Sequence, residues 1–397
     1  MSVVRGIKLG VAQAGIKKPG KDDLTIIEII EGASVAATFT RNAFCAAPVH
    51  VARAHLTASN QRARYWVINT GNANAGTGDA GMHAARATCD AVAELAACSS
   101  EAVMPFSTGV IGELLPAAKI VAALPAAFAD LKAAGWERAA SAILTTDTRP
   151  KLVSKEIALG GGSIVITGMS KGAGMIRPDM ATMLAFVATD LGIDANALDT
   201  LFRRAVNASF NRITVDGDTS TNDAAVIAAT GCSSVDYSAL SASDQSRFDT
   251  ALTEVCIELA QLIIRDGEGA TKFVEVQVNG GATPQECEDV AYTIAHSPLV
   301  KTALFASDPN WGRLLAAIGR AGLERLVVEN VSLYLNDVLI AEHGARAASY
   351  TEEQGVAAMA PEDIVIRVEL NRGNAKAAVW TTDFSYDYVK INAEYRT

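Results

Sequence analysis

A glycine-rich loop that ends in a threonine is the part of this sequence best suited to covalent chemistry. Residues 171–180 read Lys-Gly-Ala-Gly-Met-Ile-Arg-Pro-Asp-Met, and Ala181-Thr182 follows where an apolar, strand-like run begins. If the Ala181–Thr182 peptide bond is cleaved, Thr182 gains an α-amine with a pKa of about 7.7–8.0, which can accept the hydroxyl proton of the same residue. The residues therefore predict either a self-activated threonine nucleophile or a glycine turn that leads into an edge strand.

A second hydroxyl stands beside a glycine after an earlier apolar run. Ser107-Thr108-Gly109 follows a strand expected at residues 102–106. The hydroxyl of Thr108 and the unobstructed backbone N–H of Gly109 are the two kinds of donor that stabilise a developing oxyanion. Together with a threonine nucleophile, these donors predict acyl-transfer chemistry.

Histidine and nucleotide motifs are weaker signals. The five histidines, at positions 50, 55, 83, 296 and 343, have no G-x-S-x-G elbow beside them, which favours ordinary core or surface placement over a catalytic triad. Gly76-Thr-Gly-Asp-Ala-Gly81 matches G-x-G-x-x-G, but its first glycine falls seven residues after Asn69, at the expected strand end. A turn shaped by Asn72 and Asn74 is therefore favoured over a nucleotide site.

Metal chemistry has little support. Asp216-Gly-Asp-Thr-Ser-Thr-Asn-Asp223 carries oxygen ligands but lacks the spacing of a calcium loop, so a solvated turn that caps a following helix is favoured over a cation site. The six cysteines are never closer than nine residues, which leaves no C-x-x-C knuckle for zinc or a redox pair. We expect no metal and free thiols.

Composition bounds the partners and the compartment. The 397 residues are 50% hydrophobic and carry 34 basic against 44 acidic side chains, a net charge of −10. No basic block is present to neutralise phosphates, and no apolar run approaches the roughly 20 residues of a membrane span. The first residues lack an apolar export signal. We therefore expect a cytoplasmic protein that binds neither nucleic acid nor membranes.

Apolar periodicity predicts a mixed α/β fold. Expected strands are residues 24–30, 33–40, 65–69, 102–106, 151–158, 163–168, 182–189, 272–278, 325–336, 363–370 and 377–384. Expected helices are residues 79–97, 116–134, 195–207, 243–266, 285–296 and 311–321. The glycines at 160–162 should close a β-hairpin, and residues 171–180 should form a loop.

The loop and seven further motifs, spread over nearly the whole chain, resemble the ornithine acetyltransferase family, also called glutamate N-acetyltransferases. The motifs are Asn69-Thr-Gly-Asn-Ala-Asn74, Ser107-Thr-Gly-Val-Ile-Gly112, Thr145-Thr-Asp-Thr-Arg-Pro-Lys151, Asp216 to Asp223, Arg265-Asp-Gly-Glu-Gly-Ala-Thr-Lys272, Ser307-Asp-Pro-Asn-Trp-Gly-Arg313 and Ile391-Asn-Ala-Glu-Tyr-Arg-Thr397. The loop departs from the family pattern at Ala173, Arg177 and Asp179, which puts the charge beside the nucleophile in doubt.

The resemblance implies a self-cleaving enzyme with Thr182 as its nucleophile. Cleavage at Ala181–Thr182 would give an α chain of residues 1–181 and a β chain of residues 182–397, intertwined in one catalytic unit. The implied fold is a layered α/β fold with mixed sheets, similar to aminopeptidases of the N-terminal-nucleophile type. Thr108 and Gly109 would stabilise the oxyanion, and the implied substrate-binding residues are Thr145, Lys171, Thr182, Glu268, Asn392 and Thr397.

The implied reaction moves an acetyl group from N2-acetyl-L-ornithine to L-glutamate by a ping-pong route in arginine biosynthesis. No cofactor is implied, although bifunctional members also use acetyl-CoA as a co-substrate. The resemblance further implies a heterotetramer of two α and two β chains. The alternative is a self-processed aminopeptidase or amidohydrolase that uses the same N-terminal threonine.

Overall fold

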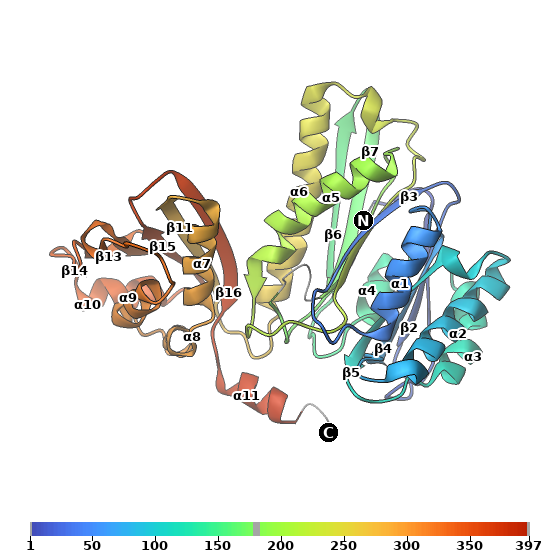
Figure 1. Ribbon diagram of the computed structural model, residues 1–397, viewed down its shortest axis with the longest axis horizontal. Helices are drawn as coiled ribbons and strands as arrows, with labels where there is room; N and C mark the ends of the chain where they lie inside the picture. The colour runs from blue at the N-terminus through green and yellow to red at the C-terminus, as the bar shows by residue number, and fades with distance from the viewer. Residues whose placement is uncertain (1, 178–182, 395–397) are drawn as a thin grey trace. The chain divides into compact units, whose positions relative to one another are not determined.

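Two units, each with its own sheets and core, account for the residues that the structure describes. The structure is a computed structural model that describes residues 2–177 and 183–394. Unit 1 takes its described residues from 1–172, 177–211 and 218–263, and unit 2 takes them from 173–176, 212–217 and 264–397. Helices and mixed sheets alternate in both units (Figure 1), which confirms the predicted mixed α/β class.

Unit 1 contains two β-sheets. The first has the strand order β1 (Ile7–Ala12), β2 (Leu24–Ile29), β4 (Tyr65–Asn72) and β5 (Val103–Val110). The second has the order β3 (Ser34–Phe39), β10 (Ala224–Ala229), β8 (Leu184–Thr189), β7 (Gly162–Lys171) and β6 (Lys151–Leu159). The β6–β7 pair is the predicted hairpin, with Leu159 opposite Gly162, because Gly160 and Gly161 adopt the positive φ angles that a tight turn needs.

The two sheets face each other across one apolar core. Successive side chains of a strand point to opposite faces of its sheet. On β2, Leu24 and Ile26 therefore join a cluster on one face, while Ile27 and Ile29 join the shared core on the other. Across that core the ring of Phe186 on β8 lies 5.9 Å from Trp66 and 5.2 Å from Phe106, measured between ring centroids. Strand β8 is therefore fixed by aromatic packing directly after the predicted nucleophile segment.

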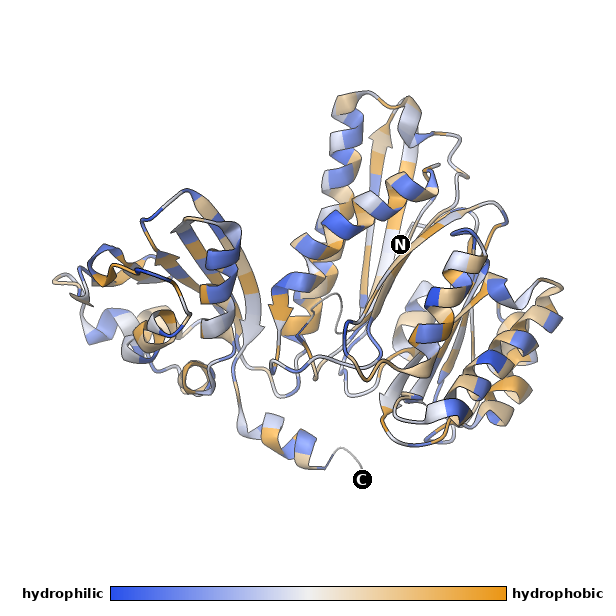
Figure 2. Cartoon of the chain, viewed as in Figure 1, coloured by the Kyte–Doolittle hydropathy of each residue, from blue (hydrophilic) through white to orange (hydrophobic). Residues whose placement is uncertain are grey.

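The helices of unit 1 pack against its two sheets, and the short helix at Trp136–Ala142 contributes to the core that the sheets share. They are α1 (Ala47–Ala58), α2 (Gly78–Ala96), α3 (Ala117–Ala129), α4 (Trp136–Ala142), α5 (Ala195–Ala208) and α6 (Ala242–Arg265), with 3-10 turns η1 (Ser100–Ala102) and η3 (Tyr237–Ala239). Helices α2 and α3 pack on the first sheet, and α5 packs on β3 and β10 of the second. In Figure 2, α5 and α6 mix hydrophilic and hydrophobic residues, as expected for helices with one face in water.

Unit 2 is built on a seven-stranded mixed sheet. Its order is β14 (Ala345–Arg346), β13 (Val338–Glu342), β12 (Ser332–Leu335), β15 (Asp363–Glu369), β11 (Phe273–Gly281), β16 (Ala375–Thr382) and β9 (Ile213–Thr214). Its helices are α7 (Pro284–Ala295), α8 (Pro298–Phe305), α9 (Trp311–Gly319), α10 (Glu352–Met359) and α11 (Tyr386–Ala393), with 3-10 turns η2 (Phe210–Arg212), which borders it in sequence, and η4 (Val328–Asn330). Buried and half-exposed residues alternate along β15, so one face of the sheet carries the core.

Two predicted elements are wrong in extent. The helix predicted at residues 116–134 ends as α3 at Ala129, because Lys132 exchanges backbone hydrogen bonds with Leu9 of β1 at 3.0 and 3.1 Å. Within the strand predicted at residues 325–336, only Ser332–Leu335 forms a strand, and residues Val328–Asn330 form a 3-10 turn. Arg325, at φ 54°, is left-handed, a conformation that interrupts a strand.

The cysteines form no disulfide, and no described helix is suited to a membrane. All six cysteines are free thiols. Among residues 2–177 and 183–394, no helix is both long enough and apolar enough to cross a bilayer.

We expect Phe186→Ala to destabilise unit 1 by about 3–5 kcal/mol, because it removes a ring packed between both sheets. Urea-induced unfolding followed by tryptophan fluorescence measures the loss. Phe44→Ala is the matched control, since 78% of Phe44 is exposed, and it should cost less than about 0.5 kcal/mol. Equal losses in the two variants would contradict this packing role.

Candidate active site

The predicted oxyanion residues lie on β5, where it runs parallel to β4 and the two backbones come close together. In the β4–β5 register Thr70 pairs with Thr108 and Gly71 pairs with Gly109. Gly109 has φ 138°, and a Cβ atom there would lie 2.2 Å from the carbonyl carbon of Gly71. Only glycine fits this position, because the conformation and the space both exclude a side chain.

Lys171 lies next to this strand end. It is the last residue of β7 and only 9% exposed, and its Nζ donates a hydrogen bond to Thr108 Oγ1 at 3.2 Å. Because an ammonium can only donate, the Thr108 hydroxyl is the acceptor in this contact and keeps its own proton for another partner. The structure thus brings together Thr108, Gly109 and Lys171, which the sequence placed in one site.

Asp147 is a buried charged residue beside Lys171 that sequence reasoning missed. Its side chain is fully buried and pairs with Lys151 Nζ at 2.6 Å, and its Oδ2 lies 4.0 Å from Lys171 Nζ. The same carboxylate accepts hydrogen bonds from the backbone N–H groups of Gly172 at 2.7 Å and Thr145 at 3.1 Å. Asp147 therefore positions both Lys171 and the predicted substrate residue Thr145.

The charge of Asp147 follows from these contacts. Burial by itself would raise the pKa of Asp147, but Lys171 and Lys151 outweigh burial and hold the pKa well below its ordinary value. The signal in the sequence was the Asp147–Lys151 spacing within the Thr145 to Lys151 motif. That spacing is equally typical of a surface ion pair, so only the fold reveals its burial.

The acidic segment at residues 216–223 is not the solvated helix cap that we expected. It leads into strand β10 rather than a helix, and Thr221, Asn222 and Asp223 are buried. Asn222 Nδ2 donates hydrogen bonds to the carbonyl oxygens of Ala73 at 2.5 Å and Ser107 at 3.0 Å. The segment therefore braces the residues just before Thr108 and Gly109. Among the described residues, no cluster of His, Cys, Asp and Glu could hold a metal ion.

Asp223 is a buried carboxyl group in this region with one oxygen left without a hydrogen bond. It is 3% exposed, and its Oδ2 has no hydrogen-bond partner. Burial raises the pKa of Asp223 well above its ordinary value, although Ser220 and Lys171 act in the opposite direction. The next residue, Ala224, pairs with Leu184 at the start of β8, and its N–H donates to Met183 O at 3.0 Å. Asp223 thus lies beside the strand that follows Thr182.

Two further predicted residues meet within unit 2. Glu268 is 7% exposed, and its carboxylate accepts a hydrogen bond from Asn392 Nδ2 of α11 at 2.8 Å. A Cβ atom at Gly174 would lie 2.3 Å from Glu268 Oε2, so a larger residue at this point of the loop would push the carboxylate aside. The backbone N–H of Glu268 also donates to Ala173 O at 2.8 Å.

The remaining predicted residues are not described by the structure. Ala181, Thr182 and Thr397 lie outside the described residues, as does Asp179. Their roles, the cleavage into residues 1–181 and 182–397, and the substrate roles of Thr145, Glu268 and Asn392 stay predictions.

The turn predicted in place of a nucleotide loop is confirmed. Asn74 is left-handed at φ 49°, and its N–H donates to Asn72 Oδ1 at 2.7 Å. Asn74 Nδ2 then donates to Gly81 O in the first turn of α2 at 2.9 Å. The side-chain amides therefore satisfy the backbone here.

We expect Asp223→Asn to stabilise unit 1 at neutral pH, because an amide has no charge to desolvate. An acid whose pKa is raised in the folded state keeps its proton there while the unfolded chain releases it, so wild-type stability falls as pH rises above about 4. The advantage of the variant should grow by up to about 1.4 kcal/mol per pH unit over that window. Thermal unfolding at pH 5 and pH 8 measures it.

Asp190→Asn is the matched control for this prediction. Asp190 is also buried, but it pairs with Arg5 at 2.9 Å and accepts a hydrogen bond from Val165 N at 2.9 Å. Its amide variant should lower the melting temperature at both pH values. If Asp223→Asn destabilises the protein as much as Asp190→Asn does, Asp223 is not an uncompensated charge.

Comparison with known proteins agrees with the motifs. Curated relatives are the arginine biosynthesis bifunctional proteins ArgJ of Pseudomonas syringae pv. tomato and Methylococcus capsulatus. The first is 54% identical over 397 residues, covering 99% of this chain and 97% of the relative. The second is 55% identical over 394 residues, covering 99% and 96%. The solved structure of the arginine biosynthesis bifunctional protein argJ from Bacillus halodurans aligns with a TM-score of 0.49 and 40% identity, covering 52% of this chain and 97% of that one.

The family profile gives the same assignment as the curated relatives. The profile described as the ArgJ family matches residues 8–397. The resemblance predicted from the motifs is confirmed, and the chain belongs to the ArgJ family.

Proposed function

We propose that the chain transfers the acetyl group of N2-acetyl-L-ornithine to L-glutamate, using Thr182 as the nucleophile after cleavage of the Ala181–Thr182 bond. Membership of the ArgJ family makes the chain an arginine-biosynthesis enzyme, since relatives that match 99% of it bear the name arginine biosynthesis bifunctional protein. The observation that carries the proposal is the contact between Lys171 and Thr108 beside Gly109. It supplies hydrogen-bond donors for an oxyanion next to the strand that Thr182 enters.

The first half-reaction acylates the enzyme. Thr182 Oγ attacks the acetyl carbonyl, and the α-amine of Thr182 takes the hydroxyl proton. The Gly109 N–H and the Thr108 hydroxyl, whose proton is not used by Lys171, stabilise the tetrahedral oxyanion. The protonated α-amine then gives its proton to the departing ornithine. The acetyl group stays on the threonine as an ester.

The second half-reaction reverses these steps with a new amine. The amine of L-glutamate attacks the acetyl-threonine, and N-acetyl-L-glutamate leaves. One amide replaces another, so neither a metal nor a cofactor is consumed. Loss of one oxyanion donor would cost on the order of 10²–10³ in rate.

Charge matching supports the substrate class. Lys171 presents a buried cation that suits the carboxylate shared by both amino-acid substrates. Glu268 suits the δ-ammonium of acetylornithine, and its bond to Asn392 holds the carboxylate in one orientation. Thr145 and Thr397 complete the proposed set of substrate residues.

Several finer features belong to the same proposal. The two chains would associate as a heterotetramer of two α and two β chains in the cytoplasm. Acetyl-CoA would serve as a second acetyl donor in a bifunctional enzyme. An assay of glutamate with acetyl-CoA in the absence of acetylornithine would test this.

A self-processed amidohydrolase is the alternative. It would release acetate at a rate independent of glutamate, whereas the transferase forms acetylglutamate.

We expect the purified wild-type protein to give two species in a denaturing mass spectrum. They should lie near about 19 and 23 kDa, because the 41.5 kDa chain divides in proportion to 181 and 216 residues. Thr182→Ala should remain intact and inactive, whereas Thr182→Ser keeps a hydroxyl and should still be cleaved. Quenching with acetylornithine alone should leave an acetyl group on the fragment that begins with Thr182. A wild-type chain that stays intact yet turns over would refute the mechanism.

We expect a tag appended to Thr397 to raise the KM for acetylornithine at least about tenfold, because it would displace a proposed substrate contact. The same tag at the N-terminus is the control and should leave KM within about twofold of the untagged enzyme. Steady-state kinetics with both tagged proteins distinguish the two outcomes. Equal KM values for the two tags would exclude Thr397 from the substrate site.

A further inference from the structure

An arginine-lined pocket lies within unit 1, between α1, α5 and strand β3. Its volume is about 680 Å³, which falls in the range of small-molecule binding sites. The lining includes Phe39 and Arg41 at the end of β3, Cys45, Arg53 on α1, and Asp199 and Arg203 on α5. None of the predicted catalytic or substrate residues lines it, so the pocket is not explained by the proposed transfer of acetyl between two amino acids.

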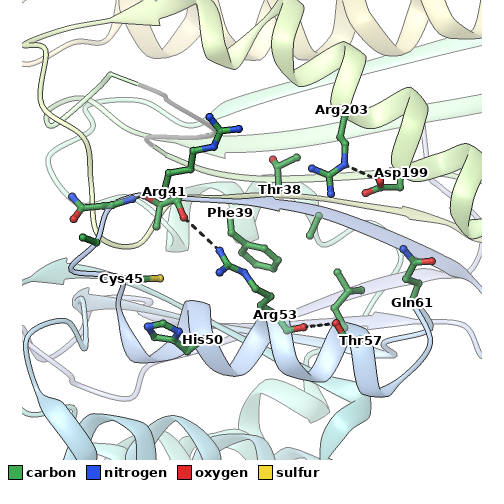
Figure 3. Close-up of a pocket in the computed structure, with 15 residues that line it drawn as sticks. Thr38, Phe39, Arg41, Cys45, His50, Arg53, Thr57, Gln61, Asp199 and Arg203 are labelled. Carbon is green, nitrogen blue, oxygen red and sulfur yellow. Dashed lines mark hydrogen bonds and ion pairs between the residues drawn. The ribbon is translucent and has the colours of Figure 1, made fainter.

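Two arginines enter the pocket from opposite helices. Figure 3 shows Arg53 of α1 and Arg203 of α5 both pointing toward the strand that carries Thr38 and Phe39. The guanidinium carbon of Arg53 lies 5.5 Å from the centre of the Phe39 ring, and its Nη2 donates a 3.5 Å hydrogen bond to Thr40 O. Both arginines therefore meet above one strand.

Neither arginine is fully neutralised by the described lining. Arg203 pairs through Nε with Asp199 Oδ2 at 2.7 Å, and 47% of its side chain stays exposed. This single contact leaves the two terminal nitrogens of Arg203 for a ligand. Asp199 is the only carboxylate among the described lining residues, and it pairs with Arg203, whereas the printed hydrogen bond of Arg53 goes to a neutral backbone carbonyl. The pocket is therefore electropositive in a protein whose net charge is −10.

The residues that line the pocket indicate which class of ligand it can bind. A guanidinium presents a rigid fork of donors that matches the oxygens of phosphate, and several arginines together suit a group with more than one negative charge. The volume is too large for a single ion, and Phe39 and Leu56 supply apolar surface for an organic part. We propose that this pocket binds a nucleotide-sized ligand through its phosphate groups, with Arg53 and Arg203 as the phosphate-binding residues.

The pocket opens at the end of the sheet that carries the proposed chemistry. Phe39 pairs with Ala224, which on its other side pairs with Leu184, two residues beyond Thr182. Neither acetylornithine nor glutamate carries a phosphate, so this site lies outside the transfer between the two amino acids; of the compounds named in the proposed function, only acetyl-CoA carries phosphate groups. A ligand held here would lie within two strands of the segment that begins with Thr182.

Isothermal titration of the full chain tests the proposal without depending on turnover. The probes are pyrophosphate, ADP and coenzyme A, with citrate as an anion of similar charge that lacks phosphate. We expect saturable 1:1 binding of at least one phosphate probe and none of citrate at the same concentration. If coenzyme A binds more tightly than ADP, the ligand is an acyl carrier. If the two bind equally, the phosphate groups alone account for the affinity.

Variants locate the binding. Arg53→Gln and Arg203→Gln should each weaken binding of the phosphate probe at least about tenfold, the effect expected from losing a charge-assisted hydrogen bond. Arg247→Gln is the matched control, since Arg247 on α6 also pairs with an aspartate of its own helix, at 3.0 Å, and 57% of its side chain is exposed. It should change binding less than about twofold.

Three outcomes overturn the proposal. They are the absence of saturable binding by every phosphate probe, equal binding of citrate, and affinities in Arg53→Gln and Arg203→Gln that match those of wild type or of Arg247→Gln. Because the readout is binding, a failure of the Thr182 mechanism leaves this result unaffected.

Discussion

The buried carboxylate of Asp147 is the interaction on which the rest of the described site depends. It contacts three places in the chain, which are the turn at Thr145, Lys151 at the start of β6, and Lys171 with Gly172 at the end of β7. Burying such a pair costs desolvation energy, and removing one partner of a buried pair typically costs about 3–5 kcal/mol. The cluster therefore adds little to the net stability of the fold, but it restricts the positions of the side chains that take part in it. It fixes where Lys171 meets Thr108.

The second constraint is the close approach of backbone at Gly71 and Gly109. Side chains cannot enter there, so the strand end presents peptide groups instead. Asn222, far away in sequence, then binds the carbonyl oxygens of Ala73 and Ser107. Such long-range contacts fix the direction in which the backbone N–H groups point. Oxyanion stabilisation requires donors that are held in this way before the reaction.

Sequence reasoning worked where the signal is periodic and local. The long helix α6, the β6–β7 hairpin and the Asn72–Asn74 turn were all predicted, because apolar spacing and turn residues determine them without distant partners. Helix α1 was missed because its Ala-rich sequence has a weak pattern, and β10 was missed because the acidic segment before it suggested a solvated helix cap.

The site residues divide in the same way. The family resemblance places Thr108, Gly109 and Lys171 in one site, and in the structure Lys171 contacts Thr108 next to Gly109. Asp147 could not be found, since a carboxylate four residues from a lysine has the same spacing whether it is exposed or buried. Burial is a property of the whole sheet arrangement, and no short window of sequence contains it.

Two buried aspartates near Lys171, Asp147 and Asp223, have pKa values that are shifted in opposite directions. The charge of Lys171, with that of Lys151, keeps the pKa of Asp147 low, so this carboxylate remains an anion throughout the physiological range. Asp223 feels the same lysine but lacks a partner for Oδ2, and burial therefore dominates and raises its pKa. Groups whose surroundings drive their pKa values apart take different roles. Asp147 holds a fixed charge in place, whereas Asp223, beside the start of β8, keeps its proton to a higher pH than an ordinary aspartate does.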